Sequence, residues 1–519
     1  MQVEPSAAAF AARYAAGEPQ VVWTTLVADL ETPVSAFLKV TTGGSGGSLP
    51  MSFLLESVEG GEVRGRYSII GLDPDVIFRA NGQSAEINRT PHNNPEAFAP
   101  AGAPPLQALR ALIAESRIAL PDALPPMAAG VFGYLGYDMV RQMEDSLGAP
   151  RSDPIGIPDA ILLRPTLVIV FDAVEDAITV VTPARPRAGL TAKAAHAHAV
   201  ERLSAIVRAL DRPLGKSATP PPNLPPLAGK VEVGAATADS NTSAEDFKRM
   251  VLRAKEYILA GDIFQVVLSQ RFETPFPLPP FALYRALRRV NPSPYLFFLD
   301  FGVFAVAGSS PEVLVKTRRG IVTIRPLAGT RRRGATPHED KALEQELLAD
   351  PKERAEHLML LDLGRNDVGR VAAIGSVKVT DQFFIERYSQ VMHIVSNVEG
   401  ELREDCDSLD ALAAGFPAGT VSGAPKVRAM QIVDELEKDK RGLYAGCVGY
   451  FSAGTDMDTC IALRTALIKD GTMYVQAGAG IVADSDPEFE QQECINKAKA
   501  LFRAAEEANR FASAAGRGQ

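Results

Sequence analysis

The sequence predicts an α+β protein, and three observations support this fold class. Hydrophobic residues make up 46% of the 519 residues and charged residues 23%, a balance typical of folded proteins and too apolar for a disordered chain. Period-two alternation marks several short strands, while apolar residues at helical spacing mark separate helices. The strands come in runs with helices between them, which favours an α+β fold over strict strand–helix alternation.

The first region, residues 20–180, is expected to form a domain built mainly from strands. Its strands are expected at residues 52–55, 65–71, 166–171 and 177–182, with a helix around residues 106–116. A Gly/Ser stretch at residues 41–48 is expected to form a flexible loop. Residues 181–239 are expected to connect this domain to the next, because their Pro-rich part at 219–226 suits neither a helix interior nor a central strand.

The second region, residues 240–508, is expected to open with a helix. Thr242 and Glu245 have capping-box spacing, and Gly261 is expected to end this helix. Strands are then expected at residues 262–272, 295–301, 303–308 and 313–325. Residues 444–482 are predicted to form a three-stranded meander, with Arg464 on one of its strands. Further helices are expected at residues 352–367, 425–437 and 487–510.

Charge and cysteine usage exclude several classes of protein. The 54 Lys and Arg residues against 63 Asp and Glu give a net charge of -9 without a basic tract, which argues against nucleic acid or anionic membrane as a partner. No apolar run approaches the length of a membrane-spanning helix, and no secretory signal is visible. The four cysteines are scattered without metal-ligand spacing, as expected in a reducing compartment. We therefore expect a cytoplasmic protein.

Two predicted helices carry carboxylates that could bind a metal ion. On the helix at 487–510, Glu490, Glu493 and Lys497 share one face, although spacing alone favours a solvated face with one Glu–Lys pair. The helix at 352–367 carries Glu356 among many leucines, so we expect it to be buried with its charges paired. Two carboxylates on separate helices could hold Mg²⁺, which keeps several waters and needs only one or two protein ligands.

Three glycine-rich stretches suggest a site for a small anion. They are residues 327–334, residues 416–426, which lead into a helix, and residues 476–481, which lie on a predicted strand. Taken singly, each is better explained as a tight turn or a sheet corner. Taken together with Arg464, they favour a ligand with carboxylates. His393 is expected on a strand, where a histidine is more often a satisfied half-buried residue than a catalyst.

Longer motifs resemble a known family. The string from Asp350 to Asp367 resembles the chorismate-utilising enzymes, as do residues 416–426, 476–481 and 486–499. Leu-Leu-Glu-Ser at 54–57 and Asn-Pro-Ser-Pro-Tyr at 291–295 narrow the resemblance to the large subunit, component I, of anthranilate synthase. The resemblance covers about residues 20–180 and 240–508. It implies a sandwich of antiparallel β-sheets flanked by helices.

The resemblance also implies a reaction and a partner. Ammonia would add to C2 of chorismate as the C4 hydroxyl leaves, giving aminodeoxyisochorismate, and loss of pyruvate would then give anthranilate, the first step of tryptophan biosynthesis. The sequence ends at Gln519 without a glutaminase domain. A separate glutamine amidotransferase subunit, component II, is therefore expected to supply the ammonia, in a heterotetramer of two large and two small subunits.

The roles of individual residues follow from the same resemblance. Glu356 and Glu493 would ligate Mg²⁺, Glu312 would act as the general acid, and His393 would take the C2 proton as general base. Thr420 is expected to line the same pocket. The residues expected to bind substrate are Gly329, Thr330, Tyr450, Arg464, Gly478, Ala479, Gly480 and Lys497.

Two positions distinguish this chain from related enzymes. Aminodeoxychorismate synthases carry a nucleophilic lysine where this chain has Ala328, and isochorismate and salicylate synthases use a lysine to activate water where it has Gln265, which we place in the catalytic group. Both differences favour anthranilate synthase, with aminodeoxychorismate synthase component I as the second choice. A tryptophan-binding regulatory subunit without catalysis is the alternative from another class. The presence of Glu356, Glu493 and His393 argues against it.

A feedback site is implied by the Leu-Leu-Glu-Ser motif. The resemblance places tryptophan, as an inhibitor, between Glu56 and Ser57 on one side and Pro294 and Tyr295 on the other. Leu296 stands where the family usually has methionine, a residue of similar volume. The alternative for Glu56 and Ser57 is a strand end with a polar cap.

Overall fold

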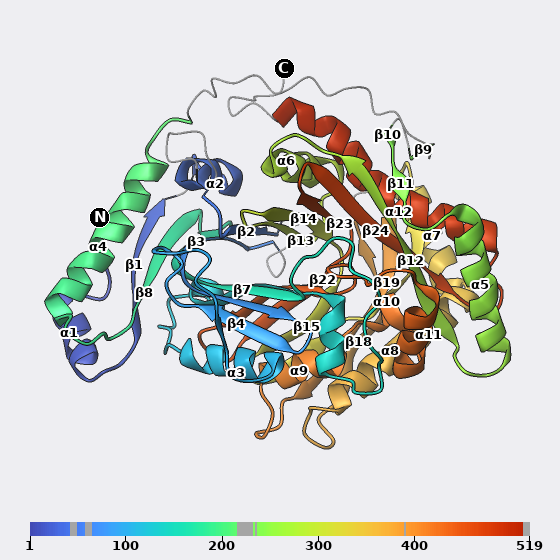
Figure 1. Cartoon of the computed structure of the whole chain (residues 1–519), viewed down its shortest axis with the longest axis horizontal. Coiled ribbons are helices and arrows are strands. Elements are labelled where there is room, and N and C mark those ends of the chain that lie inside the picture. The colour runs from blue at the N-terminus through green and yellow to red at the C-terminus, as the bar shows by residue number, and fades with distance from the viewer. Residues whose placement is uncertain are drawn as a thin grey trace.

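The computed structural model describes residues 1–27, 29–41, 49–57, 65–214, 232–233, 236–388 and 391–511. Residues 42–48 of the expected Gly/Ser loop and the Pro-rich stretch at 219–226 lie outside the described residues. The described chain forms antiparallel sheets flanked by helices, so the predicted α+β fold class is confirmed (Figure 1). No helix in these ranges is both long and apolar enough to cross a membrane.

The helices are divided between the two halves of the chain. Their bounds are α1 Ala7–Ala15, α2 Pro33–Thr41, α3 Pro105–Glu115, α4 Ala192–Leu210, α5 Ala244–Leu259, α6 Pro280–Val290, α7 Pro337–Ala349, α8 Pro351–Gly369, α9 Ser408–Gly415, α10 Gly419–Ser422, α11 Lys426–Leu436 and α12 Pro487–Glu507. Short 3₁₀ helices are η1 Pro126–Ala128, η2 Tyr137–Gln142 and η3 Ala508–Phe511.

Strands lie between these helices along the whole described chain. In the first half they are β1 Gln20–Val27, β2 Ser52–Glu56, β3 Tyr67–Asn81, β4 Ser84–Asn88, β5 Ala99–Pro100, β6 Gly130–Leu135, β7 Ala160–Asp172, β8 Ala177–Ala184, β9 Glu232–Val233, β10 Ala236–Thr237 and β11 Asp239–Ser240. In the second half they are β12 Gln265–Pro275, β13 Tyr295–Asp300, β14 Phe304–Ser310, β15 Val313–Arg318, β16 Ile321–Ile324, β17 Leu327–Arg332, β18 Lys378–Arg387, β19 Val391–Glu401, β20 Gly423–Ala424, β21 Cys447–Ser452, β22 Met457–Ile461, β23 Thr465–Lys469 and β24 Thr472–Ile481.

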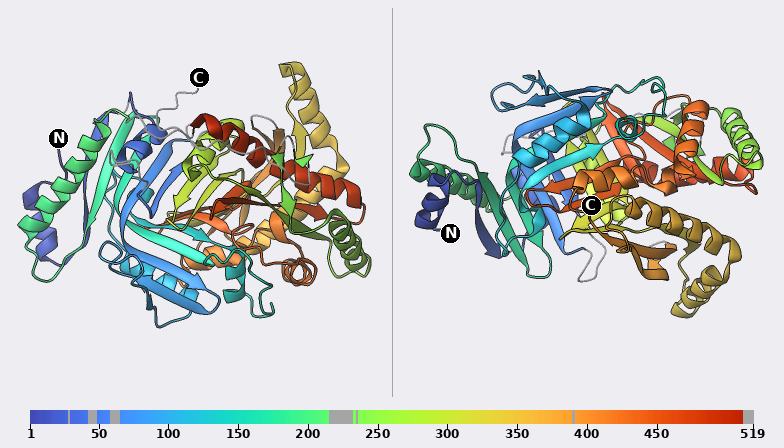
Figure 2. Two further views of the ribbon diagram at one scale, coloured as in Figure 1. Left: turned by 45° about the horizontal axis from the view of Figure 1, so that its top comes forward. Right: turned by 90° about the horizontal axis from the view of Figure 1, so that it is seen from below.

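Strands from the two halves of the chain pair directly with one another. β2 pairs with β13, so that Glu56 lies opposite Leu296, and β6 pairs with β21. Figure 2 shows the blue and cyan N-terminal strands running beside the orange and red C-terminal strands. Sheet hydrogen bonds therefore cross between residues 20–180 and 240–508, the two ranges that the sequence predicts as separate domains.

Three apolar layers hold the fold together. One lies between facing strands and contains large aromatic residues contributed by five different strands, namely Phe53, Phe132, Phe297, Phe304 and Tyr450. A second layer packs α1, α2, α4, α6 and α12 against the outer side of the strands, and a third packs α3, α5, α8, α9 and α11. Figure 1 shows α2, α6 and α12 along one edge and α3, α9, α8 and α11 along the opposite edge. The arrangement is the expected sandwich with helices outside.

Two local predictions need correction. Ser243, not Thr242, is the N-cap of α5, and its hydroxyl accepts from the Asp246 N–H, while the hydroxyl of Thr242 bonds to Asn241. The meander prediction was also wrong, because residues 444–482 contain four strands. β22 pairs with β15 and β23 pairs with β14, so the chain changes partner strands between them.

Arg464 lies in this change of partners and not on a strand. Its φ is +47°, in the left-handed region that a residue with a long side chain rarely adopts. Its carbonyl accepts from the Ser309 N–H at 3.1 Å, which fixes the connection against the end of β14. Such conformations persist only where the surrounding structure over-determines them, and they cluster at functional sites.

Candidate active site

The glycine segment of β24 forms one wall of the candidate site. β24 pairs with β12, so that Gly480 lies opposite Val267 and Gly478 opposite Ser269. A Cβ on Gly480 would lie 2.6 Å from Nε2 of Gln265, and a Cβ on Gly478 would lie 2.7 Å from Oη of Tyr444. The glycines are therefore required by side chains that approach the strand closely.

Ala479, between them, is fully buried and faces the apolar layer under α5 and α11. Only its backbone is available to a ligand on the glycine side of β24.

The first turns of α12 bring Glu493 and Lys497 against β24. Asp486 caps the helix and Pro487 is at its first turn, as the sequence predicts. Lys497 Nζ donates to the Gly478 carbonyl at 2.9 Å and pairs with Glu493 Oε1 at 2.7 Å. Glu490 is buried, and the side chains of Glu493 and Lys497 are 34% and 48% exposed. This face is therefore only partly covered by the sheet, and it carries the Glu–Lys pair that spacing alone favours.

Glu356 on α8 faces the same segment. Gln265 Nε2 donates to its Oε1 at 3.4 Å. Burial raises the pKa of Glu356, and the negative charges of Glu353 and Glu493 raise it further. A hard cation between Glu356 and Glu493 would relieve this repulsion, and Mg²⁺ needs no more than one or two protein carboxylates. Among the described residues, no group of three or more His, Cys, Asp or Glu side chains could hold a metal ion.

α8 is amphipathic and not buried on all sides. Leu358 is 49% exposed, and Asp362 and Arg365 pair on the outer face with more than half of each side chain exposed. His357 is fully buried and bonds through Nε2 to Ser396 at 2.6 Å. The expectation that this helix is buried was therefore wrong for its outer face, where Leu358 is in contact with solvent, whereas the pairing of Asp362 with Arg365 agrees with the expectation that its charges are paired.

Glu312 lies in the connection from β14 to β15 and is held by α10. Thr420 Oγ1 donates to its Oε2 at 2.9 Å. Burial raises the pKa of Glu312, and this effect outweighs the lowering by Thr420 and by the charges of Arg464 and Lys497. A carboxyl whose pKa is raised is better suited to carry a proton to a leaving group.

His393 lies on β19, opposite Thr330 on β17. A bulge in β17 gives Gly329 a φ of +77° and turns its carbonyl towards the ring. Nδ1 of His393 lies 3.0 Å from the Gly329 carbonyl and 3.0 Å from Thr330 Oγ1. Because a carbonyl oxygen only accepts, Nδ1 carries the proton and Nε2 keeps its lone pair.

The imidazole is also uncharged at neutral pH. His393 is 6% exposed, and burial lowers its pKa from 6.5 to about 4. The positive charge of Arg464 contributes to this lowering. A neutral imidazole with a free Nε2 can accept a proton.

The structure does not bring Tyr450 to this group of residues. Its ring packs 5.5 Å from that of Phe132 in the apolar layer between the sheets. Tyr444, which the sequence analysis did not select, lies beside Gly478 instead, and the charge of Glu312 contributes to raising its pKa. The two tyrosines are separated only by the structure, since Tyr444 lies in the turn before β21, next to Ala445 at φ +64°, whereas Tyr450 lies within the strand.

The expected effector residues lie at the junction of β2, β13 and α6. Glu56 is buried, accepts from the hydroxyl of Tyr284 at 2.7 Å and pairs with Arg288 Nε at 2.8 Å. Leu296, opposite Glu56, is buried in the layer under α6 and α12. Tyr295 points the other way, and its hydroxyl donates to Asp458 at 3.0 Å.

Ser57 follows β2 directly and is half-buried, and Pro294 precedes β13 and is buried. These two residues therefore adjoin the paired ends of β2 and β13.

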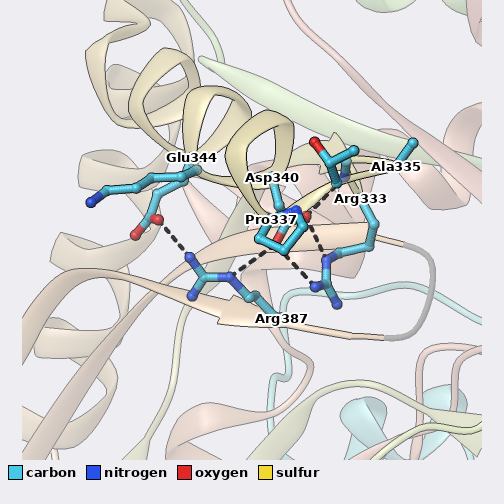
Figure 3. Close-up of a pocket in the computed structure, with 9 residues that line it drawn as sticks. Arg333, Ala335, Pro337, Asp340, Glu344 and Arg387 are labelled. Atoms are coloured by element: carbon cyan, nitrogen blue, oxygen red, sulfur yellow. Dashed lines mark hydrogen bonds and ion pairs between the residues drawn. The ribbon is translucent and has the colours of Figure 1, made fainter.

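A separate recess at the start of α7 contains none of the predicted site residues. Figure 3 shows Arg333 and Arg387 converging on Asp340, with Arg387 also reaching Glu344. Arg333 Nε lies 2.8 Å from Asp340 Oδ1, and Arg387 Nε lies 3.2 Å from Oδ2. The two guanidinium groups are thus already paired with carboxylates, so the recess offers less to an anion than its arginines suggest.

Comparison with known proteins agrees with the motifs. The profile of the chorismate binding enzyme family matches residues 52–503. Anthranilate synthase component 1 of Cereibacter sphaeroides is 58% identical over 97% of this chain and 98% of its own length, and that of Pseudomonas putida is 49% identical over 92% and 93%. The crystal structure of anthranilate synthase component I from Streptococcus pneumoniae is similar with a TM-score of 0.72, at 36% identity over 92% of this chain and 98% of that one. The chain therefore belongs to the chorismate binding enzymes and, among them, to the anthranilate synthase component 1 family.

Proposed function

We propose that this chain converts chorismate and ammonia into anthranilate and pyruvate, the first step of tryptophan biosynthesis. One observation carries the proposal. A carboxyl with a raised pKa, Glu312, and a neutral histidine, His393, lie near the same guanidinium, Arg464, beside a strand segment made of glycines. An acid, a base and a cationic anchor are the groups that this reaction needs.

Substrate binding would use the cationic side of the site. Chorismate is a dicarboxylate, and Arg464 and Lys497 lie close enough to Glu312 for both charges to act on it. The glycines at 478 and 480 let Gln265 and Tyr444 approach the backbone of β24 closely, and the ring would lie beside these two side chains. Glu356 and Glu493 would hold Mg²⁺, which supplies a positive charge that orients the ring carboxylate.

The first chemical step would be amination at C2. Ammonia attacks C2, both ring double bonds shift by one position, and the C4–O bond breaks so that the hydroxyl leaves as water with the proton that Glu312 donates. Thr420 holds Glu312 in place through its 2.9 Å hydrogen bond. The product of this step is aminodeoxyisochorismate.

The second step would be aromatisation. Nε2 of His393 takes the C2 proton, and the bond from C3 to the enolpyruvyl oxygen breaks. The enolpyruvate gains a proton to become pyruvate, and the ring becomes anthranilate. The hydrogen bond from Nδ1 to the Gly329 carbonyl fixes the orientation of the base.

Two positions support this choice of reaction over those of relatives. Ala328, next to Gly329 on β17, has no nucleophile with which to form a covalent adduct at C4. Gln265 donates to Glu356 and cannot take a proton from water. The menaquinone-specific isochorismate synthase of Escherichia coli, at 21% identity and a TM-score of 0.67, is similar to this chain in fold alone.

A partner and an inhibitor complete the proposal. The relatives are named as component 1, so we propose that a glutamine amidotransferase subunit, component II, supplies the ammonia within a heterotetramer. We also propose that tryptophan inhibits by binding beside Glu56, Ser57, Pro294, Tyr295 and Leu296. The pairing of β2 with β13 at Glu56 and Leu296 supports one shared site.

The first experiment is a fluorescence assay of the purified chain with chorismate, Mg²⁺ and an ammonium salt, with and without tryptophan. Anthranilate formed only with Mg²⁺ and suppressed by tryptophan is the expected result. A non-fluorescent amino product would place the chain with the aminodeoxychorismate synthases. Tryptophan binding without any turnover would support the regulatory alternative and overturn the proposal.

A further inference from the structure

A buried ion pair lies directly behind the candidate site. Arg441 and Glu437 follow α11, and their side chains are only 1% and 5% exposed. Arg441 Nη2 and Nε donate to the two carboxylate oxygens of Glu437 at 2.6 and 2.9 Å. A buried pair is weak support for stability, because desolvation offsets much of the attraction. The pair also makes further hydrogen bonds to backbone segments that carry site residues.

Arg441 connects three segments that carry site residues. Its Nη1 donates at 2.6 Å to the carbonyl of Val421, the residue after Thr420, and its Nη2 donates at 2.6 Å to the carbonyl of Val267 on β12. Its guanidinium also lies over the ring of Tyr444, 5.5 Å from the centroid. One planar group thus sets the spacing between α10, the start of β12 and the turn before β21.

Glu437 extends the same network to the glycine segment. Its Oε1 accepts from the backbone N–H of Ser269 at 2.8 Å and from the Ser269 hydroxyl at 2.9 Å. The amide of Gln476 donates to the same hydroxyl at 2.8 Å. Because Ser269 lies opposite Gly478, the pair also holds the β12–β24 register where the strand lines the site.

We propose that Arg441 and Glu437 are positioning residues of the active site. Together they would fix Thr420, and through it Glu312, relative to Gln265 and to the glycine wall of β24. The inference rests on the proposed function, because it concerns the same site. A displacement of about 1 Å between such groups can cost about 10²-fold in rate. A lysine in place of Arg441 keeps the charge but presents its donors from one point, so it cannot span two carbonyls and a carboxylate.

The chain offers a matched control for Arg441→Lys. Arg271 and Asp439 form another buried pair, with side chains 7% and 8% exposed and a 2.9 Å bond. Arg271 is on β12, the strand to which Arg441 and Glu437 bond, and Asp439 lies between α11 and β21, as Arg441 does. Asp439 accepts hydrogen bonds from Asn241 and Ser152, and neither of these residues belongs to the site. Arg271→Lys should therefore lower the melting temperature as Arg441→Lys does without moving the site.

The test compares steady-state kinetics of both variants, with ammonium as nitrogen donor, below the lower of their melting temperatures. Arg441→Lys should raise the KM for chorismate several-fold and lower kcat/KM by about 10²-fold, whereas Arg271→Lys should stay within about threefold of the wild type. Loss of folded protein alone would lower the apparent kcat and leave KM unchanged. Equal kinetics of the two variants would overturn the inference.

A milder variant covers the case in which Arg441→Lys does not fold. Ser269→Ala removes the hydroxyl between Glu437 and Gln476 and leaves the ion pair intact, and it should raise the KM for chorismate with little change in melting temperature. An unchanged KM would count against the positioning role. Turnover of chorismate by the wild-type chain separates the two proposals, since its absence would defeat the proposed function itself.

Discussion

The depressed pKa of His393 makes a prediction that joins stability to mechanism. At pH 7.5 the histidine is neutral in both the folded and the unfolded chain. At pH 5.5 the unfolded chain binds a proton at a pKa of 6.5, while the folded chain, with a pKa of about 4, does not. The unfolded state then holds more protons, so the free energy of unfolding falls as the pH is lowered from about 6.5 towards 4.

The size of this effect follows from the two pKa values. Integrating the proton linkage between pH 7.5 and 5.5 gives a loss of about 1.3 kcal/mol from this one side chain. The same calculation applies to His357, whose pKa is also lowered to about 4 by burial. Each histidine should therefore account for a similar share of the acid sensitivity of the fold.

Replacing each histidine by glutamine separates stability from catalysis. Urea unfolding of His393→Gln at both pH values should show a difference about 1.3 kcal/mol smaller than that of the wild type, and His357→Gln should show the same reduction. Only His393→Gln should also slow aromatisation, by about 10²- to 10⁴-fold, so that the amino intermediate appears by liquid chromatography.

Two results would refute this reasoning. An unchanged pH difference in His393→Gln would mean that the folded histidine titrates normally. Wild-type production of anthranilate by that variant would remove the imidazole from the mechanism, whatever its pKa. His357→Gln, whose side chain bonds to Ser396 and not to a site residue, serves as the control for damage to the fold.

Three further predictions concern other parts of the site. Glu493→Gln should raise the Mg²⁺ concentration needed for half-maximal activity at least about tenfold, with a matching loss of Mg²⁺ affinity in titration calorimetry. An unchanged requirement would exclude this ligand. Gly480→Ala places a methyl group 2.6 Å from Nε2 of Gln265, so the KM for chorismate should rise while the melting temperature, by calorimetry, changes little because that side chain can move. Glu312→Gln should stop amination, and wild-type activity should fall as the pH rises through the raised pKa of Glu312; a flat alkaline limb would contradict the acid role.

Much of the fold could be predicted because local patterns and global packing agree. β2, β13, β14 and α12 lie close to their predicted ranges, since their caps and alternation are strong signals. The change of strand partners at residues 462–464 could not be predicted, because it depends on which strands lie alongside β22 and β23 in space. The cap of α5 was misplaced by one residue because Thr242 and Ser243 are both good caps.

The two tyrosines show where sequence reasoning about the site ends. Tyr444 and Tyr450 stand six residues apart in one segment, and composition gives no reason to prefer either. The structure separates them, because Tyr450 is inside β21 and its side chain enters the layer between the sheets, whereas Tyr444 precedes the strand and reaches Gly478. Motifs therefore identified the neighbourhood of the site, and the choice between neighbours required three-dimensional packing.

The charges of the site explain how an acidic chain could bind a dianion. Glu312 is half-buried near Arg464 and Lys497, and desolvation outweighs both cations to leave its pKa raised. When Glu312 carries a proton it adds no negative charge to the site, which would favour binding of the substrate carboxylates. Binding of the dianion would place two more negative charges near Glu312 and raise its pKa further. The bound substrate would then favour the protonated form of Glu312 until the C4 hydroxyl leaves, and salt screens the site from the distant charges that make up the net charge of -9.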